Sequence, residues 1–213
     1  MLDLEDEMYI SRTTLEHDII EMRKKYILPY PHIKLIRHKN SISLENNERK
    51  KRALLNHLYS ENWNYNSRGN SYYNYQYMDE EVVNLIMKLT NKYIVDNHIL
   101  IEDINMVILN LSLTIMYYRI IEGHHLTEPI EITYNDPLCV VVADKLMNEL
   151  EEKLDFTISS FERSDIYLLL SCSRMYDAKK LNFETVTTFF SKDILDLVDN
   201  YINDIKSKCH VDF

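Results

Sequence analysis

The chain contains only two glycines in 213 residues, and this scarcity limits the folds open to it more than any other feature. Average usage would give about 7 % glycine, and phosphate-binding loops need several glycines close together. Gly69 and Gly123 stand alone, which argues against P-loop NTPases, Rossmann enzymes and nucleotide kinases. The four prolines are also few, whereas a β-sandwich needs many tight turns. The length of 213 residues and the hydrophobic fraction of 46 % are enough for one or two modest domains with a core.

Composition also bears on compartment and membrane association. The three cysteines, Cys139, Cys172 and Cys209, form no CxxC pair, which favours a reduced, cytoplasmic compartment. The N-terminus is acidic and so unlike a signal peptide. The most apolar segment, 106–121, is interrupted by polar side chains. It predicts a buried helix rather than a membrane span.

The formal net charge of −10 is unevenly distributed along the chain. Residues 9–52 carry 11 Lys/Arg and 5 Asp/Glu, whereas residues 53–213 carry 13 basic and 25 acidic residues. A basic N-terminal block on an acidic body favours a head that binds a polyanion. A merely solvated charged face is the alternative.

The N-terminal region has the element order of a winged helix-turn-helix. A short helix over 2–8 and a turn precede a helix that begins after Ser11 as N-cap and runs to about Tyr26. Residues 32–45 predict two short strands that form a wing. The alternative is a structural cap. The expected DNA contacts are Arg12, Thr13, Thr14 and His17 on the recognition helix, and Lys34, Arg37 and Lys39 on the wing.

The rest of the chain predicts helices. A helix over 47–61 is followed by a Tyr/Asn-rich loop to residue 77. Gly123 suits the position after a helix, Pro137 a first helical turn, and Ser159 with Glu162 a capping box. A short extended piece is expected at Ile130–Thr133. Five helices are expected to form a bundle, over about 79–97, 103–122, 137–154, 159–174 and 183–208.

Three runs of sequence resemble one bacterial family. They are similar to regulators that carry the phosphotransferase-system regulation domain. The N-terminal run is SRTTLEHDIIEMRKKY followed by IKLIRHKNSISLENNERKKRALLNHLY. The other two runs are LNLSLTIMYYRIIEGHHL and VVVADKLMNELEEKLDFTISSFERSDIYLLLS. This family includes sugar-operon activators, RNA-binding antiterminators and Mga-type virulence regulators. The central helix of that domain ends in an Arg-Ile pair and a Gly, here Arg119, Ile120 and Gly123.

The resemblance implies control by phosphorylation, but this chain departs from the family at both acceptor positions. Phosphotransferase proteins phosphorylate two histidines in the family's domain, and Ser112 and Ser171 stand at the matching positions here. Serine takes no part in a His-to-His phosphoryl relay. Both serines would most simply be small polar residues back-bonded to their own helices. His124 and His125 are alternative phosphoacceptors or a polar helix end.

The sequence-based interpretation is a mainly α transcription regulator without enzymatic activity, cofactor or metal. Its expected regions are a partial winged helix-turn-helix (1–47), a connecting helix and loop (48–77), a helical regulation domain (78–182) and a helix resembling the start of a second regulation domain (183–213). Expected partners are DNA, a second copy in a homodimer and phosphotransferase-system proteins, and no membrane. The chain is expected to be a fragment of a longer regulator. The alternatives are a protein-interaction or dimerisation module that binds no DNA, and an RNA-binding antiterminator.

Overall fold

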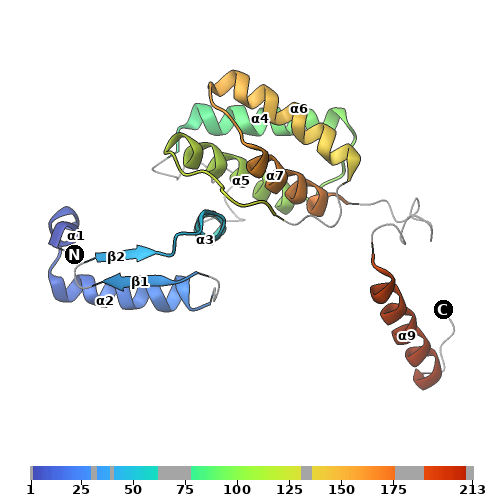
Figure 1. The fold of residues 1–213 in the computed structure, drawn as a ribbon, viewed down its shortest axis with the longest axis horizontal. Coiled ribbons are helices and arrows are strands. Elements are labelled where there is room, and N and C mark those ends of the chain that lie inside the picture. The colour runs from blue at the N-terminus through green and yellow to red at the C-terminus, as the bar shows by residue number, and fades with distance from the viewer. Residues whose placement is uncertain are drawn as a thin grey trace. The chain divides into compact units, whose positions relative to one another are not determined.

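The computed structural model describes residues 2–29, 33–38, 41–61, 78–130, 136–175 and 190–209. The chain divides into two compact units, Met1–Ser173 and Arg174–Phe213. The described residues are mainly helical, with a small two-stranded antiparallel hairpin (Figure 1). The mainly helical character that the helical patterns along the chain predicted is therefore confirmed.

The N-terminal helices form where they were expected, with one irregularity. Helix α1 spans Leu2–Met8 and α2 spans Arg12–Met22, and the Oγ of Ser11 caps α2 by accepting a hydrogen bond from the Thr14 amide at 3.2 Å. The chain then widens into a π-helical turn, η1 (Arg23–Ile27), in which the Leu28 amide donates to the Arg23 carbonyl at 2.9 Å. The helix therefore extends to about Tyr26 as predicted, but its last turn is π-helical and Ile27 is the buried residue at its end.

The predicted hairpin is present. Strands β1 (Leu35–His38) and β2 (Ser41–Leu44) pair antiparallel, with Leu35 opposite Leu44. These two leucines pack against a small core that includes Ile33 and Leu54. Because Leu54 belongs to α3 (Glu48–Glu61), this core ties the hairpin to the next helix. The two residues between the strands lie outside the described residues.

Four helices form the centre of the larger unit: α4 (Glu80–Asp96), α5 (Asp103–Ile121), α6 (Pro137–Leu154) and α7 (Ser160–Ser173). Helix α6 packs on α4 and α7, and α5 packs on α4 and α7, so the four form a ring (Figure 1). All four helices were predicted from apolar spacing. The predicted extended piece at Ile130–Thr133 and most of the Tyr/Asn-rich loop lie outside the described residues.

Helix α5 is buried on two sides, which explains why its sequence is apolar nearly all round. Leu109 and Leu113 face the four-helix core, whereas Leu111 and Ile115 contact Leu55 and other residues of a second core beneath α3. By length and composition α5 could cross a membrane, but 44 % of that apolar window is buried inside the fold. Its apolar residues thus serve as a core helix, as the sequence predicted.

The helix ends show which capping predictions hold. Asp136 caps α6 by accepting from the Leu138 amide at 2.9 Å, with Pro137 in the first turn. Gly123 follows α5 with a φ of 81°, a left-handed conformation that glycine adopts without strain. The capping box at α7 is half wrong. The Oγ of Ser159 accepts from the Glu162 amide at 3.4 Å, but the Glu162 carboxylate binds Arg52 and the Leu126 amide instead.

Two features differ from the predicted five-helix bundle. Helix α3 packs against α5 within the larger unit, whereas α9 (Lys192–Cys209) belongs to the second unit. Helix α9 begins later than the predicted residue 183, and residues 176–189 lie outside the described residues. Every apolar side chain on its hydrophobic face is partly or largely exposed. These are Ile194, Leu197, Val198, Tyr201, Ile202 and Ile205.

Candidate functional site

The structure brings part of the predicted DNA-binding surface together. The Oε1 atom of Glu16 on α2 lies 3.6 Å from Arg12 Nε and 3.4 Å from Arg37 Nη2. Arg12 is on the first turn of α2 and Arg37 is on β1, and their side chains are 61 % and 53 % exposed. The start of the predicted recognition helix and the predicted wing therefore share one exposed, basic face.

The other predicted DNA contacts are exposed but less closely linked. Thr13 and His17 are exposed on α2, and the Nδ1 atom of His17 lies 3.8 Å from Asp18 Oδ1. The hydroxyl of Thr14 lies 2.9 Å from Ser11 Oγ and so contributes to the helix cap. Lys34 is exposed immediately before β1. Lys39 lies outside the described residues.

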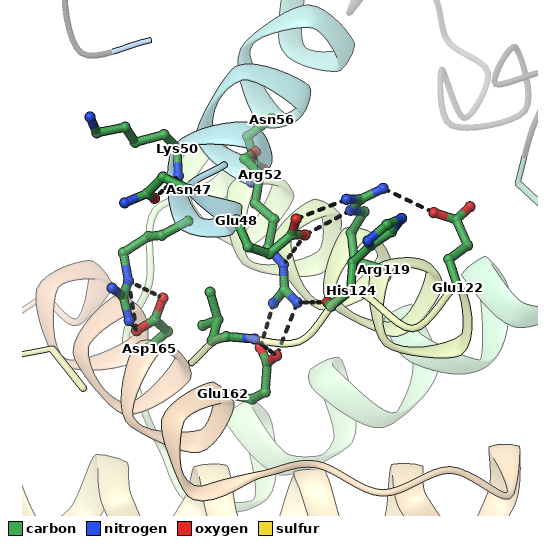
Figure 2. Close-up of polar contacts among 12 residues, drawn as sticks. Asn47, Glu48, Lys50, Arg52, Asn56, Arg119, Glu122, His124, Glu162 and Asp165 are labelled. Carbon is green, nitrogen blue, oxygen red and sulfur yellow. Dashed lines mark hydrogen bonds and ion pairs between the residues drawn. The ribbon is translucent and has the colours of Figure 1, made fainter. Parts of the chain in front are cut away.

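Sequence reasoning missed a network of ion pairs between α3, α5 and α7, which Figure 2 shows. At its outer end, Arg49 on α3 binds the carboxylate of Asp165 on α7 through two nitrogens, at 2.9 Å from both Nε and Nη2. Arg49 Nη2 also donates to the Glu128 carbonyl at 3.0 Å. The hydrogen bond with Asp165 raises the pKa of Arg49. A bidentate arginine–carboxylate pair of this kind fixes the relative orientation of the two side chains as well as the distance between them.

The centre of the network is a buried pair. The Glu162 side chain is 0 % exposed, and Arg52 binds it with both terminal nitrogens. Glu162 Oε1 also accepts from the Leu126 amide at 2.9 Å, and Arg52 Nη2 donates to the His124 carbonyl at 2.9 Å. A charge in this position is tolerated only because it is paired and hydrogen-bonded. The pair thus holds α3, α7 and the segment after α5 in a fixed relation.

Glu48 completes the network because its carboxylate accepts hydrogen bonds from two arginines, Arg52 and Arg119. Its Oε1 accepts from Arg52 Nε at 3.1 Å and from Arg119 Nε at 2.7 Å, and its Oε2 accepts from Arg119 Nη2 at 2.8 Å. Burial raises the pKa of Glu48, but the hydrogen bonds from Arg119 and Arg52 outweigh it and the net shift is downward. The hydrogen bond with Glu48 raises the pKa of Arg119. Arg119 is the arginine of the family-like Arg-Ile pair.

The two serines at the family's phosphoacceptor positions have different surroundings. Ser112 Oγ lies 3.3 Å from Asn56 Oδ1 on α3, and Ser112, Asn56, Arg49 and Arg52 line a cavity of about 200 Å³. Ser171 Oγ is buried, and no hydrogen-bond partner for it lies among the described residues. The prediction that both serines bond back to their own helices is therefore wrong, because Ser112 bonds to Asn56 on another helix and Ser171 has no hydrogen-bond partner among the described residues.

The alternative phosphoacceptors His124 and His125 are exposed beyond the end of α5. The backbone of His124 is used twice, since its amide donates to the Arg119 carbonyl at 2.8 Å and its carbonyl accepts from Arg52. Within the residues described, no cluster of three or more His, Cys, Asp or Glu side chains could hold a metal ion. His124 is thus joined to the network through its backbone.

The network was only partly readable from the sequence. Glu48 and Arg52 are four residues apart on one helix, a spacing that predicts a local pair. Nothing in the spacing points to Asp165 or Glu162, which are more than 100 residues away along the chain. No protein-family model and no curated protein matches this chain. Its function is therefore argued from its own residues.

Proposed function

We propose that this chain is part of a transcription regulator that binds DNA through α2 and the β1–β2 hairpin. The observation that carries the proposal is the Glu16 bridge, which sets Arg12 and Arg37 on one exposed face. A recognition helix and a wing that act on one duplex need this arrangement. The excess of basic residues over 9–52 supports it, because phosphate contacts dominate DNA affinity.

The helical body is proposed to be the regulation domain of the phosphotransferase-system type. The network of Arg49, Arg52, Glu48, Arg119 and the α7 carboxylates supports a role in transmitting a signal, since it joins the helix after the hairpin to the bundle. In this proposal serine replaces the relay histidines, so the signal arrives by a route other than their phosphorylation. Phosphotransferase-system proteins remain proposed partners for other surfaces of the domain.

DNA binding is tested by salt titration of the full chain against a short duplex of mixed sequence. The logarithm of the binding constant falls with the logarithm of salt concentration by about 0.9 for each phosphate contact. Replacing Arg12 and Arg37 together with alanine should lower that slope by about 1.8 if each arginine contacts one phosphate. The matched control replaces Lys88 and Lys145, which are exposed on α4 and α6 and carry the same charge.

The control variant should retain the wild-type slope. An equal loss in both double variants would mean that only net charge matters, and would overturn the assignment of α2 and β1. No binding by the wild type would also overturn it. A structured RNA bound in preference to the duplex would favour the antiterminator alternative.

A second candidate function, a self-association module, is favoured by α9. Its apolar side chains recur at intervals of three and four residues on one face, and all are exposed. The charges on the helix are asymmetric. Asp193, Asp196 and Asp199 outnumber Lys192 in its first half, whereas Lys206 and Lys208 outnumber Asp204, which pairs with Lys208, in its second half. Two copies of α9 packed antiparallel would place acidic halves beside basic ends. We therefore propose a second copy of this chain, in antiparallel orientation, as the partner of α9.

Size-exclusion chromatography with light scattering on the full chain tests this candidate. The wild type should be a dimer, and Val198→Asp should be a monomer because it places a charge in the apolar face. Asn203→Asp introduces the same charge on the opposite face and should remain a dimer. Antiparallel helices place the two Cys209 thiols at opposite ends, about 27 Å apart. Mild oxidation should therefore give no Cys209 cross-link, and a cross-link or a monomeric wild type would refute the proposal.

A further inference from the structure

A second cavity lies between the N-terminal region and α3, and it differs in character from the polar network. It has a volume of about 430 Å³, within the range of small-molecule sites. Most of the lining is apolar and comes from η1, the hairpin and α3, with Met22 of α2 and Arg119 of α5 also at the cavity. Tyr26 comes from η1, Leu35, Ile42 and Leu44 come from the hairpin, and Leu54 and Leu58 come from α3.

The two cationic side chains at this cavity differ in whether they already have a carboxylate partner. Arg119 reaches it, but its guanidinium is already bound to Glu48 and Glu122. Lys51 also lines it, and its ammonium has neither a hydrogen bond nor an ion pair among the residues that the structure describes. The preceding residue, Lys50, is by contrast paired with Glu45 at 2.6 Å and does not line the cavity. Lys51 is thus a cation at the edge of an apolar cavity with no carboxylate partner in the described fold.

The wall of the cavity contains the backbone irregularity of the N-terminal region. Tyr26 and Ile27, both in the π-turn over Arg23–Ile27, line the cavity. Turns of this kind recur at functional sites because they re-aim side chains at the cost of helix regularity. The apolar volume, the available cation and the π-turn are three independent observations at one place.

We propose that this cavity binds an apolar monocarboxylic acid, such as a medium-chain fatty acid, with its chain among the leucines and its carboxylate on Lys51. An apolar cavity lined by one lysine without a carboxylate partner in the described fold is complementary to a molecule that has one anionic end and one apolar body. The cavity lies between the hairpin and α3, so a bound acid contacts both the proposed wing and the helix that anchors it. The site does not depend on DNA binding.

Isothermal titration of the full chain with decanoate, and separately with 1-decanol, tests the proposal. Lys51→Met keeps the length of the side chain and removes its charge. It should weaken decanoate binding about tenfold, the size expected for a lost charge-assisted hydrogen bond, and leave decanol binding unchanged. Lys50→Met is the matched control and should change neither affinity. Ile42→Trp should block both ligands by filling the apolar volume, and Leu35→Phe serves the same purpose if the tryptophan variant does not fold.

Three results would overturn the proposal. They are no decanoate binding by the wild type, equal effects of Lys50→Met and Lys51→Met, and unimpaired binding by a folded cavity-filling variant. Because the titrations contain no DNA, their failure leaves the proposed DNA-binding surface untouched, and a failure of DNA binding leaves this site untouched.

Discussion

Replacing Glu162 with glutamine tests whether the network holds the helical unit together. The substitution keeps an oxygen for the Leu126 amide but turns an NH₂ group toward the donors of Arg52. Removing one partner of a buried ion pair costs about 3–5 kcal/mol because the other charge is left uncompensated. Arg52 keeps its contacts with Glu48 at 3.1 Å and with the His124 carbonyl at 2.9 Å. We therefore expect the lower end, about 3 kcal/mol.

Urea unfolding followed by far-ultraviolet circular dichroism measures this loss, and thermal unfolding should show a Tm lower by about 6–12 °C. Glu149→Gln is the control, since it removes a carboxylate of the same type whose partner Lys92 is 47 % exposed, and surface pairs contribute little. The double variant Glu162→Gln/Arg52→Gln should recover part of the loss because it removes the uncompensated charge. A loss below about 1 kcal/mol for Glu162→Gln would refute the reasoning.

Three further predictions concern single positions and the same unfolding assay. Ser171→Ala should leave stability unchanged or raise it, because its buried hydroxyl has no partner in the described fold, whereas Ser112→Ala should cost about 1 kcal/mol with the bond to Asn56. A loss of stability for Ser171→Ala, or no loss for Ser112→Ala, would contradict the assigned surroundings. Gly123→Ala should cost about 1–2 kcal/mol from its φ of 81° alone, since nothing lies within 4 Å of an added Cβ. A cost near zero would mean that the turn relaxes. The folded pKa of Glu48 lies below its ordinary 4.5, so its contribution is complete above 4.5 and is lost as pH falls through the folded value. The difference in unfolding free energy between wild type and Glu48→Gln should therefore shrink below pH 4.5, and a constant difference would exclude this linkage.

The helices and the hairpin could be predicted because their signals are local. Ser11, Asp136 and Gly123 act on backbone groups within a few residues of themselves, and apolar spacing marks the buried face of each helix. The π-turn at Arg23–Ile27 could not be predicted from local patterns, and Ile27 at its end packs with Ile33 and Leu54, which lie outside that helix. Local patterns therefore predict where elements lie more reliably than how regular they are.

The network and the apolar cavity could not be predicted for a related reason. Glu162 has the spacing of a capping-box residue, and only the approach of Arg52 from α3 draws its carboxylate away from that role. Lys51 looks like one more charge in a basic run, and its position at an apolar cavity appears only when the hairpin is in place. Both features depend on tertiary packing between segments that are distant in the chain.

Helix α3 packs on both the hairpin and α5, and this affects where a fragment of the chain can begin. Its leucines cover the hairpin and α5, and its arginines neutralise Glu162 and Asp165. A regulation domain expressed from residue 78 onward, as the sequence suggested, would leave two carboxylates of α7 without their counter-ions and part of α5 without its cover. A soluble helical fragment should therefore begin before Asn47, so that α3 remains with the bundle.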